Sequence, residues 1–102
     1  MVKLNISPKA LSDLQDIKEY IATELENPDA ALKTVNKIIS AIRRLANFPD
    51  IGSPLSSIID VHTDYRFLVS GNYLVFYRRE NDVAYVLRVL YGKRDYIKTL
   101  FE

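Results

Sequence analysis

The stretch from Tyr73 to Asp95 constrains the fold of this chain more than any other, because its pattern predicts two strands joined by a tight turn. Tyr73 to Tyr77 are five consecutive aromatic or aliphatic residues, and Val83 to Tyr91 is a second apolar run. The segment Glu80–Asp82 between the runs favours turn geometry. Regular alternation along the second strand would place two sets of side chains on opposite faces: Val83, Tyr85, Leu87, Val89 and Tyr91 on one, and Ala84, Val86, Arg88 and Leu90 on the other.

Size and composition set further limits. A chain of 102 residues with 48% apolar residues can form a core of its own, so we expect a single domain over residues 1–102. No apolar run approaches the ~18 residues of a membrane span, and the first residues carry no secretory-signal pattern, which predicts a cytoplasmic protein with no membrane contact. The chain has no cysteine, a single histidine (His62) and no glycine-rich phosphate loop, so we expect no metal site and no cofactor.

Two start signals that contain proline predict a helical hairpin. Ser7 before Pro8 and Asn27 before Pro28 each combine an N-cap residue with a proline at the first helical position. We expect the first helix to end near residues 24–26. The second should stop at Phe48, because a residue that precedes a proline is disfavoured in helical geometry. Apolar residues recur at spacings of three and four in both segments, so each helix has one face to bury.

Strands account for most of the remaining chain. Residues 2–6 alternate apolar and polar side chains, and residues 65–69 form a further strand before a turn at 70–72. We expect a short strand or turn at 58–61, and one helical turn or a packed tail at 96–102. The order β-α-α-β-β-β predicts an α+β fold in which the helical hairpin packs on one face of a twisted antiparallel sheet.

The net charge of +1 conceals an uneven distribution of cations. Residues 65–102 carry seven cations and four anions, a net charge of +3. Six of these cations come from the predicted sheet or its immediate end: Arg66, Arg78, Arg79, Arg88, Lys93 and Arg94. A basic last third fits a surface that faces phosphates, and ordinary solvated charge explains it equally well.

Arg88 has two interpretations, because it lies between Val86 and Leu90 on a strand. Either a carboxylate holds it in a structural ion pair, since charged groups are rarely buried unpaired, or it faces an open surface as a phosphate contact. Among the carboxylates, Asp13 and Asp16 are spaced three residues apart, which is more typical of a helix surface than of a catalytic pair.

Arg94 follows Gly92 and Lys93 at the end of the last strand, a position from which loops often carry function. Tyr91 lies beside these cations and could stack on a base or on an aromatic partner. We therefore expect any functional surface to include this end of the hairpin.

The order and spacing of several short segments resemble the RelE/ParE superfamily of toxins from type II toxin–antitoxin modules, whose members are often described as plasmid-stabilisation proteins. The segments span nearly the whole chain: Leu14 with Tyr20-Ile21; Asn27-Pro28 with Ala30-Ala31; Ile42, Leu45, Phe48-Pro49, Gly52 and Pro54-Leu55; Tyr65-Arg66 with Leu68-Val69; Asn72–Arg78; and Val86–Asp95. The resemblance implies the fold predicted above. It also implies a growth-inhibiting cytoplasmic toxin, which a cognate antitoxin holds inactive in a hetero-oligomer.

Two activities divide this superfamily. RelE-like members are metal-independent, ribosome-dependent mRNA endonucleases, and ParE-like members poison DNA gyrase. The nucleases usually carry an arginine after the tyrosine of the third strand, where this chain has Leu74 after Tyr73, and the last-strand motif often has a histidine where this chain has Tyr91. The resemblance therefore favours gyrase inhibition, with ribosome-dependent mRNA cleavage as the alternative. An inactive homologue that only binds antitoxin is a third reading.

The resemblance also implies candidate functional residues. If the chain is a nuclease, its catalytic candidates are Arg94, Arg66 and Tyr91. The candidates for binding the target or a phosphate are Lys93, Arg94, Arg88 and Arg78. General acid–base catalysis at neutral pH needs a group with a tunable pKa, which arginine does not supply, so these residues favour binding over chemistry.

Overall fold

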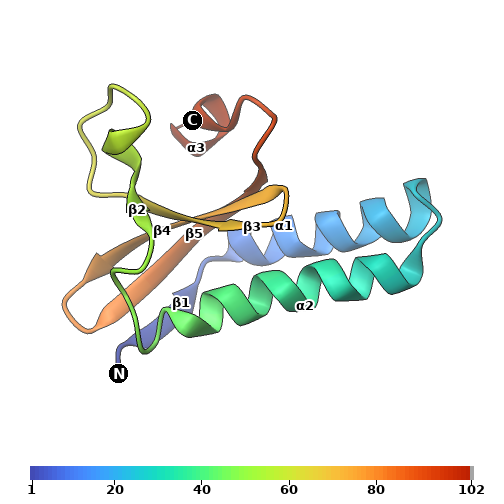
Figure 1. Ribbon diagram of the computed structural model, residues 1–102, viewed down its shortest axis with the longest axis horizontal. Helices are drawn as coiled ribbons and strands as arrows, with labels where there is room; N and C mark the ends of the chain where they lie inside the picture. The colour runs from blue at the N-terminus through green and yellow to red at the C-terminus, as the bar shows by residue number, and fades with distance from the viewer. Residues whose placement is uncertain (102) are drawn as a thin grey trace.

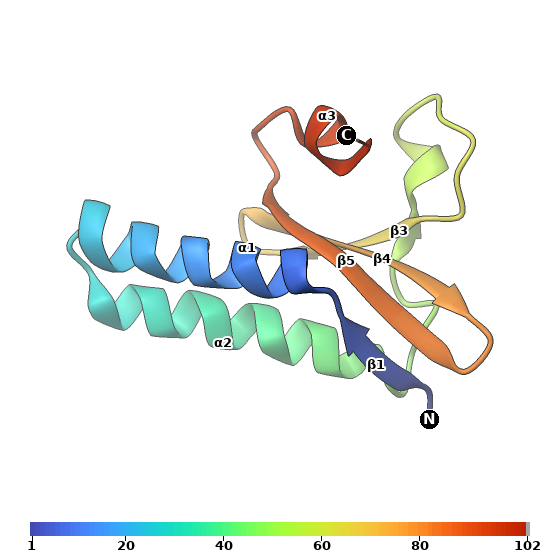
Figure 2. The ribbon, with the colours of Figure 1, turned by 180° about the vertical axis from the view of Figure 1, so that it is seen from behind.

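The computed structural model describes residues 1–101 of the chain. A five-stranded sheet with the order β1-β5-β4-β3-β2 forms its centre. Its strands are β1 (Lys3–Ile6), β2 (Ser53–Pro54), β3 (Arg66–Ser70), β4 (Tyr73–Glu80) and β5 (Val83–Tyr91). Two long helices lie against one face of the sheet, and the short C-terminal helix α3 (Tyr96–Phe101) lies on the opposite face (Figures 1 and 2).

Both predicted helix starts are confirmed. Helix α1 (Pro8–Glu19) begins after Ser7, whose side chain accepts a hydrogen bond from the N–H of Ala10 at 3.0 Å. Helix α2 (Pro28–Arg44) begins after Asn27, whose Oδ1 accepts from the N–H of Ala30 at 3.1 Å. Beyond Glu19, α1 widens into one π-helical segment, Tyr20–Glu24, before the turn into α2. Wider turns of this kind re-aim the side chains that follow a regular helix.

The predicted α+β fold is confirmed, with one correction to the sheet. β1 pairs with β5 in parallel, with Lys3 opposite Val83 and Ile6 opposite Val86, so the sheet is mixed and not wholly antiparallel. The β3–β4–β5 meander leaves one edge of β5 unpaired, and β1 fills part of that edge. The edge strand β2 pairs antiparallel with the start of β3. The sequence pattern does not predict β2, because it contains a proline.

A β-bulge changes which side chains of β5 face the helices. Between Phe76 and Tyr77 the pairing shifts by one residue, so that Phe76 lies opposite Arg88 and Tyr77 lies opposite Val86. Val89 is therefore buried in the same core as Val86, although regular alternation would place the two on opposite faces. The predicted alternation is wrong beyond the bulge.

The core lies between the helical hairpin and the sheet, and α3 covers part of the other face. The largest of its fully buried side chains are Tyr77, Phe76, Ile38, Ile42, Leu45, Leu55, Val75, Val86 and Val89. On the α3 side, the ring of Tyr96 lies 5.4 Å from that of Phe76, and Phe101 stacks on Tyr65 at 5.6 Å. Helix α3 confirms the helical turn among the two forms expected at 96–102, of which residue 102 lies outside the described residues. Within residues 1–101, every helix is too short or too polar to cross a membrane.

Candidate functional site

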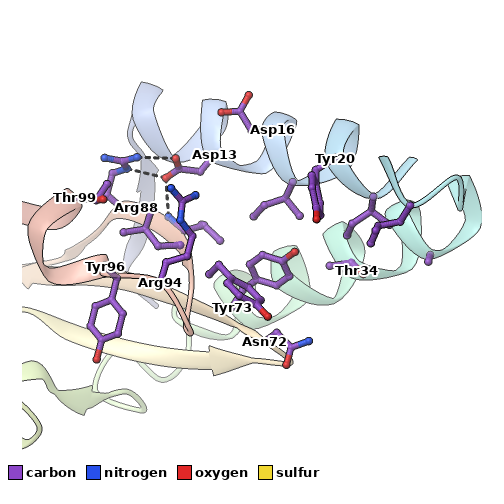
Figure 3. Close-up of a pocket in the computed structure, with 17 residues that line it drawn as sticks. Asp13, Asp16, Tyr20, Thr34, Asn72, Tyr73, Arg88, Arg94, Tyr96 and Thr99 are labelled. Carbon is purple, nitrogen blue, oxygen red and sulfur yellow. Dashed lines mark hydrogen bonds and ion pairs between the residues drawn. The ribbon is translucent and has the colours of Figure 1, made fainter. Parts of the chain in front are cut away.

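An open groove of about 900 Å³ lies beside the C-terminal end of β5. Its walls come from α1 and the π-helical segment, from the start of α2, from the β3–β4 turn and from α3 (Figure 3). Its polar and aromatic lining is Asp13, Asp16, Tyr20, Thr34, Asn72, Tyr73, Arg88, Tyr91, Arg94, Tyr96 and Thr99. Its apolar lining is Ile17, Ile21, Leu25, Ala30, Val89 and Leu90.

A bidentate ion pair closes one end of the groove. The guanidinium of Arg88 donates to both carboxylate oxygens of Asp13, from Nε at 2.8 Å and from Nη2 at 2.9 Å. The same carboxylate accepts the backbone N–H of Val89 at 2.9 Å. The hydrogen bond and the charge of Asp13 raise the pKa of Arg88 above its ordinary value, and partial burial opposes this rise.

The Asp13–Arg88 ion pair decides between the two interpretations of Arg88 and tests the expectation that Asp13 is a surface residue. Arg88 takes the first of its two interpretations, an ion pair with a carboxylate. Asp13 is 9% exposed, so the expectation of a surface carboxylate is wrong for this residue, whereas Asp16 is exposed as expected. No local sequence signal marks the burial of Asp13, because its partner lies 75 positions away.

Three tyrosines form the middle of the groove, and they come from three separate elements. Tyr73 begins β4 and Tyr91 ends β5, and their rings meet edge to face at 5.7 Å. Tyr20 reaches them from the π-helical segment. Burial, and then the neighbouring phenols of Tyr91 and Tyr20, raise the pKa of Tyr73 above its ordinary value of 10.0. Tyr73 therefore remains a neutral phenol at physiological pH and cannot act there as a base.

Arg94 is the cation that this groove presents to solvent. It follows β5 directly, and its backbone N–H donates to the carbonyl of Tyr91 at 3.2 Å. The strand end itself is held by Gly92, whose N–H donates to the carbonyl of Asn72 at 2.8 Å. The side chain of Arg94 is exposed and forms no ion pair with a carboxylate of residues 1–101. Figure 3 shows Arg94 in the end of the groove near Asp13 and Arg88, with Tyr20 and Thr34 further along it.

The groove brings together only part of the predicted set of site residues. Tyr91, Arg94 and Arg88 line it, and Lys93 is exposed beside Arg94. Arg66 does not join them, because it begins β3, two strands away from β5, and pairs there with Tyr77 in the middle of β4. Its Nη2 donates to the backbone carbonyl of Asp50 at 3.4 Å.

Arg78 is also remote from the groove. It lies opposite Tyr85 in the β4–β5 pairing, and its guanidinium carbon is 5.7 Å from the centre of that ring. It donates to Glu80 at 2.8 Å and approaches Asp64 at 3.7 Å. Arg78 and Arg94 are thus at opposite ends of β4 and β5, and one small ligand cannot contact both.

The part of the chain described, residues 1–101, contains no group of three or more histidine, aspartate or glutamate side chains placed to hold a metal ion. The polar groups of the groove are phenols, one amide, hydroxyls, two carboxylates and two arginines.

Comparisons with known proteins identify the family. A model described as "ParE toxin of type II toxin-antitoxin system, parDE" matches residues 4–96. Among solved structures, the chain is similar to one titled "Chromosomal ParDE TA system from P. aeruginosa", with a TM-score of 0.76 and 23% sequence identity over 91% of this chain and 98% of that chain. No curated protein matches the chain. The structural likeness shows the fold, while the family model covers most of the sequence. The chain therefore belongs to the ParE toxin family of type II toxin–antitoxin systems.

Proposed function

We propose that this ParE-type toxin arrests growth by binding and inhibiting DNA gyrase, in the cytoplasm, and that a cognate antitoxin neutralises it by occupying the groove. The observation that carries the choice of target is the chemistry of the groove. It presents a free guanidinium, Arg94, among tyrosines and apolar side chains, a combination that suits binding to a protein surface.

Cleavage of an RNA strand requires chemical groups that this groove does not supply. A nuclease that activates a 2′-hydroxyl near neutral pH needs a base with a pKa near 7 within reach. The pKa of Tyr73 is raised, and Arg88 is held by Asp13. The single histidine, His62, lies outside the groove in the loop before β3. These observations support inhibition by binding over catalysis.

Ribosome-dependent mRNA cleavage is the second candidate, and one observation favours it. Arg94 and Tyr91 line the same groove, so that a phosphate held by Arg94 would have an aromatic ring beside it on which a base could stack. Arg66, the third residue of the predicted catalytic set, would then have no part in the reaction.

A pair of assays with the purified protein tests the choice of target. We expect the protein to block DNA supercoiling by gyrase in proportion to its concentration and to leave a ribosomal translation reaction intact. Inhibition of translation, with new mRNA ends inside codons and unaffected supercoiling, would replace gyrase by the ribosome as target.

The antitoxin part of the proposal follows from the exposed surface of the groove. A partner segment with apolar side chains would fill the end lined by Ile17, Ile21 and Leu25, and its acidic residues would face Arg94 and Lys93. We expect a stable toxin–antitoxin hetero-oligomer when the chain is co-expressed with its neighbouring open reading frame. Arg94→Glu should weaken this complex, and an unchanged affinity would place the antitoxin elsewhere.

A further inference from the structure

Where β1 no longer covers the edge of β5, side chains of α1 and of its N-cap residue Ser7 contact that edge. β1 ends at Ile6, opposite Val86, while β5 runs on to Tyr91. Along this remainder of the edge, the Ser7 hydroxyl donates to the carbonyl of Leu87 at 2.8 Å. Backbone groups on an unpaired edge otherwise depend on water or on a partner chain.

Asp13 makes the next contact along the same edge. It accepts the N–H of Val89 at 2.9 Å, on the side of the strand that β1 no longer covers. Arg88 pairs in register with Phe76, so its side chain begins on the face of the sheet that α3 covers. Its guanidinium extends to the edge of the sheet and contacts the same carboxylate. One buried carboxylate thus holds both the backbone and a side chain of β5.

We infer that Asp13 is a positioning residue, whose carboxylate replaces a neighbouring strand and fixes the end of β5 that carries Tyr91 and Arg94 into the groove. Val89 precedes Tyr91 by two residues and Arg94 by five, so a shift of the strand at Val89 moves the wall of the groove. This inference rests on the proposed function only where it concerns potency. The position of the strand end is a property of the fold and can be measured by itself.

Two double variants separate positioning from charge. Asp13→Ala with Arg88→Met removes every contact of the carboxylate and leaves no buried charge unpaired. Asp13→Asn with Arg88→Gln also removes both charges, but the amide oxygen at position 13 still accepts the N–H of Val89. Glu19→Gln is the matched control, because Glu19 is an exposed carboxylate of the same helix outside the groove.

The first readout is amide hydrogen exchange along β5. In the Ala/Met variant we expect the Val89 amide to exchange about tenfold faster or more, as the loss of one buried acceptor implies. The amide of Val86, where β1 still covers the strand, should stay close to its wild-type rate. The Asn/Gln variant and Glu19→Gln should keep slow exchange at both positions.

The second readout is the amount of protein needed to arrest growth. We expect the Ala/Met variant to need about tenfold more protein than the Asn/Gln variant, because both lack the two charges and only the second keeps the acceptor at position 13. Fast exchange at Val89 with unchanged potency would overturn the positioning role. Unchanged exchange at Val89 in the Ala/Met variant would overturn it as well. Faster exchange of all amides would also overturn it, because the contact would then contribute to global stability and not to the position of the strand end.

A third result would also overturn the inference. If the Asn/Gln variant keeps slow exchange at Val89 but loses as much potency as the Ala/Met variant, the charge of Arg88 contacts the target directly. If the wild-type chain does not arrest growth at all, the proposed function fails, whereas the exchange rates at Val89 and Val86 still confirm or refute the role of Asp13 in holding β5.

Discussion

The phenol oxygen of Tyr77 lies 2.9 Å from the backbone nitrogen of Gly52 and accepts its hydrogen bond inside the core. The same hydroxyl donates to the carbonyl of Pro49 at 2.8 Å. Tyr77 is fully buried in the middle of β4, so one side chain of the sheet holds the loop that leaves α2. This contact fixes where the chain turns back toward β2 and β3.

Gly52→Ala should destabilise the fold. A Cβ at this position would meet the carbonyl oxygen of Phe67 and the ring and hydroxyl of Tyr77, each at 2.7 Å, and none of these can move freely. We expect a loss of about 1–3 kcal/mol in the free energy of unfolding, measured by urea denaturation. Gly71→Asn is the control, because this turn position has φ +59° with open space around it, and asparagine tolerates such a backbone conformation. The urea midpoint of this variant should change little. Equal effects of the two changes would contradict this account.

Tyr77→Phe should cost about 1–3 kcal/mol of unfolding free energy, because the buried N–H of Gly52 loses its acceptor. Thermal unfolding monitored by circular dichroism measures the effect. Tyr85→Phe provides the comparison, since this partly exposed ring lies at the surface under Arg78 and keeps its contact with that guanidinium. A Tyr77→Phe protein as stable as Tyr85→Phe would show that the hydroxyl does not hold the loop.

Tyr73 should make the protein less stable at alkaline pH. Its pKa is raised in the folded state, so folding favours the neutral phenol. The stabilisation is fully present below the unfolded pKa of about 10 and is lost as pH rises through the folded pKa. The urea midpoint of the wild type should therefore fall above about pH 10 more steeply than that of Tyr73→Phe. Parallel curves for the two proteins would refute a raised pKa.

Arg94→Ala should weaken growth inhibition by about tenfold or more. The protein should keep its stability, because the side chain of Arg94 is exposed and its removal leaves no buried partner behind. The dose of inducer that halves the growth rate measures this effect. Arg43→Ala, at the exposed end of α2 and outside the groove, should arrest growth as the wild type does. If both variants remain toxic, Arg94 does not contact the target.

Local sequence signals predict the elements of this fold well. Ser7-Pro8 and Asn27-Pro28 each supply a cap whose hydrogen bond is observed, because capping depends on residues only three positions apart. The strands of the β4–β5 hairpin follow in the same way from their apolar runs and from the turn between them.

Contacts between distant parts of the chain explain what the sequence does not predict. The bulge opposite Phe76 moves Val89 to the helix side, and no residue type marks it. Asp13 and Arg88 are 75 positions apart, and the groove joins segments from both ends of the chain. Arg66 and Arg94 are both arginines of the basic last third, yet the meander places Arg66 opposite the middle of β4 and Arg94 beyond the end of β5.

The most direct test of the proposed function is a pulse-labelling time course after the chain is induced alone in growing bacteria. DNA synthesis and protein synthesis are followed in the same culture. We predict that DNA synthesis falls first and that DNA-damage signalling follows, as expected for inhibition of gyrase. An earlier fall in protein synthesis, with new mRNA ends inside codons, would contradict the account and make Arg94 and Tyr91 catalytic candidates.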